Sequence, residues 1–417
     1  MRKSLWWFWV FARAQKGFLV MGAGLLVLGV ALISIIKHYY FDLTFISIEY
    51  GIILALIGVG LAFYGFMKGS RGVIDLASSL ASVNIYDYLR RDVQKRRGPR
   101  IVVIGGGTGL SVLLKGLKNY TNHLTAIVTV MDDGGSSGRI REMGMLPPGD
   151  IRRCLVAMAR TENLMDRVFQ HRFVEGKGIE GHNLGNLLIT ALTDITGDFI
   201  KAIAEVSKVL AVQGQVLPAT LQLVALGATM TDGTVVMGET SITGAGKQIK
   251  EVFLDPPQCR AVPEAIEAIR EADAIILGPG SLFTSIIPDL LVPEIGDALR
   301  TTRALRIFVV NIMTQPGETT GFTATDHLDA VSRHLGPGHI DYVVVNDTPV
   351  DKERESRYRL EDAEPVRFDQ RELADRGVKC IRGSLLGKED VAWHDSEALA
   401  RTVMRIIYER KGLNWLE

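Results

Sequence analysis

The sequence predicts an α/β protein with a Rossmann-like, doubly wound, mostly parallel sheet, preceded by a two-helix transmembrane hairpin. From residue 100 onward, short runs rich in Val and Ile alternate with helical stretches, as in sheets that helices cover on both faces. Nearer the N-terminus, two runs with almost no charge are long enough to span a bilayer. We therefore expect a hairpin over residues 1–70, a basic juxtamembrane helix over 71–99 and one main domain over 100–417.

The hairpin is expected from GFLVMGAGLLVLGVALISII at 17–36 and from a second apolar run at 45–67. A pair of buried core helices is one alternative, and a cleaved signal peptide is another, but no small-residue cleavage site follows the first run. Basic residues precede the first run, and the cluster QKRRGPR at 94–100 follows the second. The positive-inside rule then places both ends, and the main domain, in the cytoplasm at the cell membrane. The cluster could contact anionic lipid or act only as a topology signal.

Bulk composition narrows the function classes. The 417 residues carry zero formal net charge, which argues against a nucleic-acid partner. The three cysteines, Cys154, Cys259 and Cys380, are far apart and form no CxxC pair, which argues against a zinc site or a disulfide framework.

Six apolar runs are expected to be strands of the main sheet, at 100–105, 124–131, 221–228, 273–280, 306–313 and 341–346. Ligands of open α/β sheets bind outside the carboxyl ends of the strands. The residues that follow each run are therefore the candidates for a functional site.

The first run is followed by GGGTGLS, with Gly106, Gly107, Thr108 and Gly109. Glycines let a backbone turn tightly and approach a ligand, and a helix expected from about Leu110 would point its N–H groups at this loop. The pattern is neither GxGxxG nor a P-loop. It favours phosphate or nucleotide binding, with a purely structural tight turn as the alternative.

The second run is followed by DDGGSSGRIR. Asp132 and Asp133 could accept hydrogen bonds from ribose hydroxyls, or hold a magnesium ion that bridges to phosphate. Ser136 and Ser137 offer hydroxyl donors, and Arg139 can pair with phosphate or carboxylate. An ordinary exposed loop that caps a helix is the alternative.

Further along, Asp150 is expected to be the N-cap of a helix. His182, Asn183 and Asn186 stand at the start of an apolar helix, which is a favourable place for an anion, although a single histidine could equally be structural.

A second glycine loop, LGPGS, contains Gly280 and Ser281. Polar residues therefore follow five or six of the expected strands. This many polar strand ends suggest a long cleft for an extended ligand, such as a nucleotide with a second group attached.

The motifs GGGTGLS, DDGGSSGRIR, PPGDIRRCL, GHNLGN, LGPGSLFTSIIP and NIMTQPGET, spread over about residues 100–410, resemble those of the gluconeogenesis factor (YvcK-like) family. That family is related to the CofD-like 2-phospho-L-lactate transferases, which use magnesium to pass phospholactate from a guanylated donor to a deazaflavin. The YvcK-like branch is associated with UDP-sugar binding, cell-wall morphogenesis and growth on gluconeogenic carbon.

The stretch DDGGSSGRIREMGMLPPGD is similar to the YvcK-like form, so the resemblance implies a regulator that binds a nucleotide sugar. A magnesium-dependent 2-phospho-L-lactate transferase is the alternative, with Asp132 and Asp133 as metal ligands and the catalytic residues unassigned. By the same resemblance Tyr358 stacks on a base, whereas Trp393 stands where the family has a basic residue, which puts one phosphate contact in doubt. The expected partners are a nucleotide sugar or dinucleotide-like ligand, the membrane, cell-wall synthesis proteins and further copies of the chain in a homo-oligomer.

Overall fold

The computed structural model describes residues 2–41, 47–80, 93–160 and 164–412. The chain forms two compact units, Met1–Gln94 and Lys95–Glu417, each with its own internal packing.

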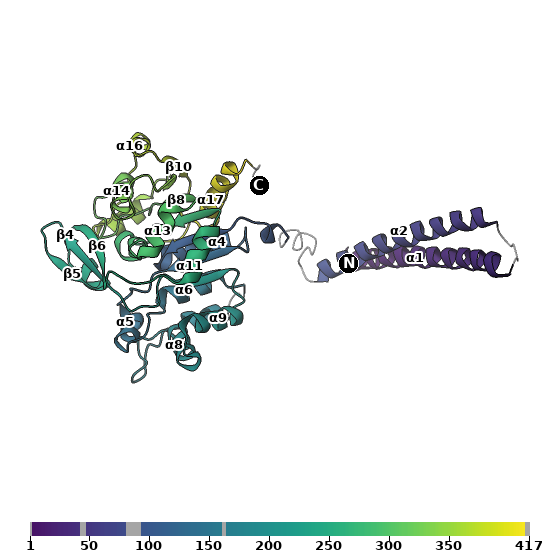
Figure 1. Ribbon diagram of the computed structural model, residues 1–417, viewed down its shortest axis with the longest axis horizontal. Helices are drawn as coiled ribbons and strands as arrows, with labels where there is room; N and C mark the ends of the chain where they lie inside the picture. Colours follow the sequence, from purple (N-terminus) through teal and green to yellow (C-terminus); the bar gives the residue numbers. More distant parts are fainter. Residues whose placement is uncertain (1, 42–46, 81–92, 161–163, 413–417) are drawn as a thin grey trace. The chain divides into compact units, whose positions relative to one another are not determined.

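The N-terminal unit contains two long helices, α1 (Arg2–Phe41) and α2 (Ile48–Leu80), which lie side by side (Figure 1). Small residues line the seam between them. A Cβ added to Gly58 would lie 2.7 Å from the backbone nitrogen of Leu28, and one added to Gly65 would overlap the backbone nitrogen of Met21. The two backbones therefore touch, as they do where small residues join membrane helices.

The outward faces of this pair carry large apolar side chains, such as Leu19, Leu26 and Leu56, which are 71%, 74% and 69% exposed. Two stretches, Gln15–His38 and Ile48–Arg71, are long and apolar enough to cross a membrane, so the pair is compatible with a membrane hairpin. Helix α2 continues through residues 71–80, the first part of the expected juxtamembrane helix. The next part of that segment, at 81–92, lies outside the described residues.

The second unit is built on a seven-stranded sheet in which every neighbouring pair is parallel, with the order β10-β9-β8-β7-β1-β2-β3. Its strands are β1 (Ile101–Gly105), β2 (Leu124–Val128), β3 (Gln215–Pro218), β7 (Ala274–Leu277), β8 (Leu305–Val309), β9 (Tyr342–Asn346) and β10 (Lys379–Gly383). The predicted doubly wound, Rossmann-like sheet is confirmed.

Helices cover both faces of the sheet (Figure 1). The described helices of this unit are α4 (Gly107–Leu117), α5 (Gly135–Glu142), α6 (Gly149–Met158), α7 (Leu164–Gln170), α8 (Leu184–Thr196), α9 (Phe199–Val209), α10 (Glu239–Gly244), α11 (Pro263–Glu271), α12 (Ile287–Leu290), α13 (Pro293–Thr301), α14 (Ala324–Leu335), α15 (Lys352–Arg359), α16 (Gln370–Asp375) and α17 (Ser396–Arg410), with a π-helical turn, η1 (Leu282–Ile286), before α12.

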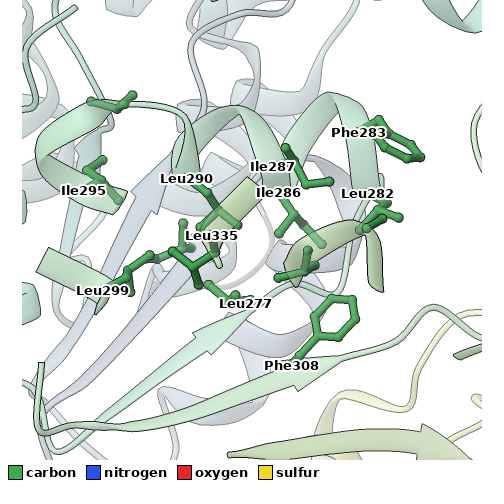
Figure 2. Close-up of a cluster of buried hydrophobic side chains, with 14 of the residues drawn as sticks. Leu277, Leu282, Phe283, Ile286, Ile287, Leu290, Ile295, Leu299, Phe308 and Leu335 are labelled. Carbon is green, nitrogen blue, oxygen red and sulfur yellow. The ribbon is translucent and has the colours of Figure 1, made fainter. Parts of the chain in front are cut away.

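Alternate residues of each strand enter two separate cores, because successive side chains point to opposite faces of a sheet. Val102 and Ile104 of β1 face the core under α11–α14, whereas Ile101 and Val103 face the core under α4, α6, α9 and α17. Figure 2 shows the first core, where Ile286 and Ile287 lie above strands β7 and β8. Burial on both faces explains why these strands appear as continuous apolar runs.

One strand that was predicted for the main sheet belongs to a different sheet. Residues 221–228 include the start of β4 (Ala225–Met230), which pairs antiparallel with β5 (Val235–Met237) and β6 (Ile249–Asp255) in a separate three-stranded sheet. An apolar run of this length does not distinguish a parallel from an antiparallel partner. The edge strands β3 and β10 were not predicted, because QVLP and KCIRG mix polar and apolar residues and carry little strand signal.

Candidate functional site

The candidate site lies at the carboxyl ends of β1 and β7, where the strand order reverses. The two glycine loops touch there. A Cβ on Gly109 would lie 2.7 Å from the carbonyl oxygen of Pro279, and one on Gly280 would lie 3.0 Å from the carbonyl oxygen of Gly106. Gly107 has φ +70°, in the left-handed region that favours glycine. Only residues without side chains allow this approach of the two loops.

Asp150 does not cap its own helix, so this prediction was wrong. It is the second residue of α6, and its Oδ2 accepts a hydrogen bond from the backbone N–H of Gly107 at 2.7 Å. Its Oδ1 pairs with Arg153 at 2.5 Å. Helix α4 also starts at Gly107 rather than near Leu110, with no side-chain cap of its own. The carboxylate of Asp150 therefore serves the start of α4, and its own helix, α6, has no side-chain cap.

Asp132 and Asp133 have different neighbours. Asp132 Oδ1 accepts from the backbone N–H of Gly134 at 2.9 Å. Asp133 Oδ1 accepts from the backbone N–H of Thr240 at 2.9 Å and from its hydroxyl at 2.7 Å, which fixes the start of α10. Of the two, Asp133 is the one tied to another element.

Further acidic side chains lie near Asp132 and Asp133. Burial first, and then the nearby charges of Asp132, Asp150, Glu318 and Asp133, raise the pKa of Glu239 to about 9. Within the described residues, no three His, Cys, Asp or Glu side chains are grouped to hold a metal ion by themselves. Magnesium commonly binds one or two carboxylates together with phosphates of a substrate, and the acids here suit that mode. Glu239 was not predicted, because 106 residues separate it from Asp133.

Ser136 is the centre of a buried polar network. Its Oγ lies 3.1 Å from His182 Nδ1 and accepts from the backbone N–H of Asn183 and from Asn186 Nδ2, each at 3.2 Å. The Oδ1 of Asn186 accepts from Arg152 Nε at 2.9 Å. The residues of GGSSG and GHNLGN that the sequence suggested are therefore brought together, and Asn183 also caps α8.

Ser137 and Arg139 lie on the same short helix. Ser137 is buried, and a Cβ on Gly149 would overlap its hydroxyl oxygen. Arg139 is half-buried, with a guanidinium nitrogen 3.1 Å from where a Cβ on Gly181 would stand. This glycine leaves room for the guanidinium beside His182.

The second glycine loop is held by residues of the segment that follows β8. Asn311 bonds both the N–H and the carbonyl oxygen of Gly280, at 3.1 and 2.8 Å. Gln315 donates to Ser281 Oγ at 2.8 Å. Tyr358 lies on α15, where its hydroxyl accepts from the backbone N–H of Ala392 at 3.1 Å.

A cavity of about 1260 Å³ opens beside the first glycine loop, at Thr108. It runs between α4, α6, α7 and the 387–396 loop. Its basic lining residues are Lys115, Lys118, Arg152, Arg153, Arg167 and Lys388, against the acids Asp166, Glu389 and Asp395. Trp393 and His394 also line it, and burial lowers the pKa of His394 to about 4. The basic residues come from separate elements, so sequence motifs did not reveal them as a group.

The fold and this site define a Rossmann-like protein with glycine loops at the reversal of strand order. Residues 101–386 match the family of the 2-phospho-L-lactate transferase CofD. The Bacillus subtilis protein named gluconeogenesis factor is 50% identical over 313 residues, which are 75% of this chain and 99% of that protein. The chain therefore belongs to the gluconeogenesis factor family of CofD-like proteins.

Two further relatives extend this likeness. A putative gluconeogenesis factor of Clostridium acetobutylicum is 40% identical over 412 residues, 96% of this chain and 91% of its own length, so its alignment includes the hairpin region. An X-ray structure of a Bacillus halodurans protein superposes with a TM-score of 0.72 at 49% identity, covering 74% of this chain and 99% of the other. That match is consistent with the second unit folding as a protein in its own right.

Proposed function

We propose that the protein is a regulator that binds a nucleotide sugar and acts on cell-wall synthesis, cell shape and gluconeogenic growth. The single observation that carries the binding proposal is the large basic cavity that opens at Thr108, beside two touching glycine loops. Its size suits a ligand longer than a mononucleotide, and its excess of Lys and Arg suits a diphosphate.

We assign the diphosphate to the side of the first glycine loop that faces the basic cavity. The N–H of Gly107 already serves the carboxylate of Asp150, so it is not free for phosphate. Thr108, Arg153 and Lys388 offer a hydroxyl and two cations on the cavity side. Asp132 would then accept from ribose hydroxyls, and Trp393, which is 44% exposed, offers an aromatic face in the same cavity.

The two apolar helices support a location at the cell membrane, with the second unit on the cytoplasmic side. A tether of this kind would keep a cell-wall regulator beside membrane-bound synthesis proteins, its expected partners. Assembly as a homo-oligomer belongs to the same proposal.

A magnesium-dependent 2-phospho-L-lactate transferase is the second candidate, because acids gather beside the glycine loop. Asp132 and Asp150 are near enough to Glu239 for their charges to raise its pKa, and a bound divalent cation would lower that pKa again. Bound magnesium would stabilise charge on a transferring phosphoryl group.

Titration calorimetry on residues 95–417 tests the main proposal, with UDP-sugars, dinucleotides and guanine nucleotides as probes. We expect UDP-sugars to bind, and Lys388→Gln to weaken them by about two- to five-fold, the usual range for one exposed ion pair. Lys250→Gln, an exposed residue of β6 away from the cavity, is the matched control. Equal affinity in the two variants would remove the cavity from the ligand site.

A further inference from the structure

The hydrogen-bond network around Ser136 fixes where its protons lie. Arg152 Nε can only donate, so the atom of Asn186 that faces it at 2.9 Å must be the oxygen Oδ1. The other amide atom of Asn186, Nδ2, therefore faces Ser136 Oγ and donates to it at 3.2 Å. The backbone N–H of Asn183 is a second obligatory donor to the same oxygen, also at 3.2 Å.

A serine hydroxyl has two acceptor lone pairs and one proton. Both lone pairs of Ser136 are used by Asn183 and Asn186, so its proton must point along the remaining contact, to His182 Nδ1 at 3.1 Å. That nitrogen must then be an acceptor without a proton. A neutral imidazole with a bare Nδ1 carries its proton on Nε2.

We propose that the donor chain Arg152–Asn186–Ser136 holds His182 as a neutral imidazole with its proton on Nε2, and that this N–H donates to an oxygen of the ligand that has no proton of its own. The ligand part of this inference rests on the proposed function. The oxygen would belong to a phosphate, carboxylate or carbonyl group. His182 is thus a positioning and specificity residue rather than a general base toward the ligand.

The surroundings of His182 agree with this assignment. Within the described residues no hydrogen bond occupies its Nε2, and this atom is not among the fully buried unsatisfied ones, so it is open toward solvent. Arg139 of α5 is the charged group that acts on His182. Two further arginines bond to its neighbours: Arg152 donates to Asn186 Oδ1, and Arg172 donates to the carbonyl oxygen of Gly181 at 2.9 Å. Burial, and then the charge of Arg139, lower the pKa of His182. The guanidinium of Arg139 and the Nε2–H of His182 are both donors, so together they favour a ligand group that only accepts hydrogen bonds.

The test is ¹⁵N NMR of residues 95–417 labelled at histidine, with the His182 signals identified from their loss in His182→Gln. We expect a pyridine-type Nδ1 and a pyrrole-type Nε2 at neutral pH. Asn186→Asp keeps an oxygen for Arg152 but turns the donor to Ser136 into an acceptor. The Ser136 proton should then turn away from His182, and the histidine should change to the tautomer with its proton on Nδ1.

Asn183→Asp is the matched control, because it adds the same charge nearby while its backbone N–H still donates to Ser136 and its side chain still caps α8. It should leave the tautomer unchanged. A wild-type imidazolium or a protonated Nδ1 at neutral pH would overturn the inference, whether or not Asn186→Asp folds. An unchanged tautomer in folded Asn186→Asp would show that the chain of donors does not control His182.

Ligand contact is read separately. Saturating UDP-N-acetylglucosamine should move the Nε2 signal of His182 while Nδ1 stays pyridine-type. A ligand that binds without moving Nε2 would refute the donor role. If UDP-N-acetylglucosamine and the other UDP-sugars fail to bind, the proposed function fails, whereas the tautomer in the ligand-free protein still tests the network.

Discussion

The carboxylate of Asp150 accepts a hydrogen bond from the backbone N–H of Gly107 at 2.7 Å, across 43 positions of the sequence. The glycine loop is therefore held by a protein acid before any ligand arrives. Burial raises the pKa of this carboxyl, and Arg153 opposes the shift. The loop is pre-organised on one side by Asp150, which leaves its basic side for a phosphate.

Gly107→Ala tests whether the conformation of this loop matters for the ligand. The added Cβ would have space, with Ser285 Oγ as its nearest neighbour at 3.9 Å, but φ +70° is unfavourable for alanine. We expect a loss of about 1–2 kcal/mol in the free energy of unfolding and a large loss of UDP-sugar affinity, measured by denaturation and calorimetry.

Gly377→Ala is the matched control, because Gly377 has φ +78° and nothing within 4 Å of an added Cβ. It should lose similar stability and keep its affinity. If both variants keep the affinity of the wild type, the first loop is only structural.

Glu239→Gln tests, through the pH dependence of stability, whether Glu239 is buried among the other acids of the site. The folded protein keeps Glu239 protonated up to about pH 9, whereas the unfolded chain releases that proton near the ordinary glutamate pKa of 4.5. Stability from this group is therefore complete below the lower value and declines as pH rises toward 9. The Gln variant should unfold at a higher temperature than the wild type at pH 8–9 and at nearly the same temperature at pH 4–5.

Glu267→Gln of α11 removes one acid on a different helix and controls for net charge. The same pH dependence in the control and in Glu239→Gln would mean that Glu239 is not the source. Loss of the difference on adding magnesium would indicate that a cation occupies the acid cluster.

Much of this fold can be predicted from the sequence, because a strand buried on both faces needs an unbroken run such as IVVIG, and helices must cover it. The loops after β1, β2 and β7 could be anticipated for the same reason, since parallel strands end at one edge. The antiparallel pairing of β4 could not be anticipated, because apolar residues such as Ala225 and Leu226 occur in parallel and antiparallel strands alike.

The site was less predictable, because its contacts are tertiary. Asp150 stands at the start of a helix and fits a capping rule, yet its carboxylate accepts from the N–H of Gly107 instead of from its own helix. Glu239 and Lys388 carry no local pattern, and only the fold brings them to the edges of the site.

Gly65→Val tests the seam of the N-terminal hairpin. Its side chain would overlap the backbone of Met21, so we expect α1 and α2 to separate. Separation would expose Ala31, which is fully buried in the described structure. In the full chain in mild detergent, with Cys380→Ser to lower the background, Ala31→Cys should react faster with maleimide when Gly65→Val is present.

Gly60→Val is the control for this seam, because nothing lies within 4 Å of its added Cβ. Its labelling rate should match that of Ala31→Cys without either glycine substitution. Equal acceleration by both valines would mean that the close approach at Gly65 does not hold the helices together.

Asp132→Asn separates a regulator from an enzyme. In a regulator, Asp132 only accepts hydrogen bonds from a ribose, so the variant should lose about 1–3 kcal/mol of UDP-sugar binding, the scale for hydrogen bonds to a charged group. Binding by the wild type should survive chelation of magnesium. Stability should not fall, since Asn keeps an oxygen for the N–H of Gly134 and removes a charge that raises the pKa of Glu239. Asp133→Ala, by contrast, removes the acceptor at the start of α10 and should cost about 0.5–2 kcal/mol of unfolding free energy.

The assay that decides between regulator and enzyme supplies a guanylated phospholactate donor and a deazaflavin acceptor and measures nucleotide release. We expect no turnover; metal-dependent turnover that disappears in Asp132→Asn would establish the transferase instead, because transfer chemistry needs the charge that this carboxylate gives to the metal site.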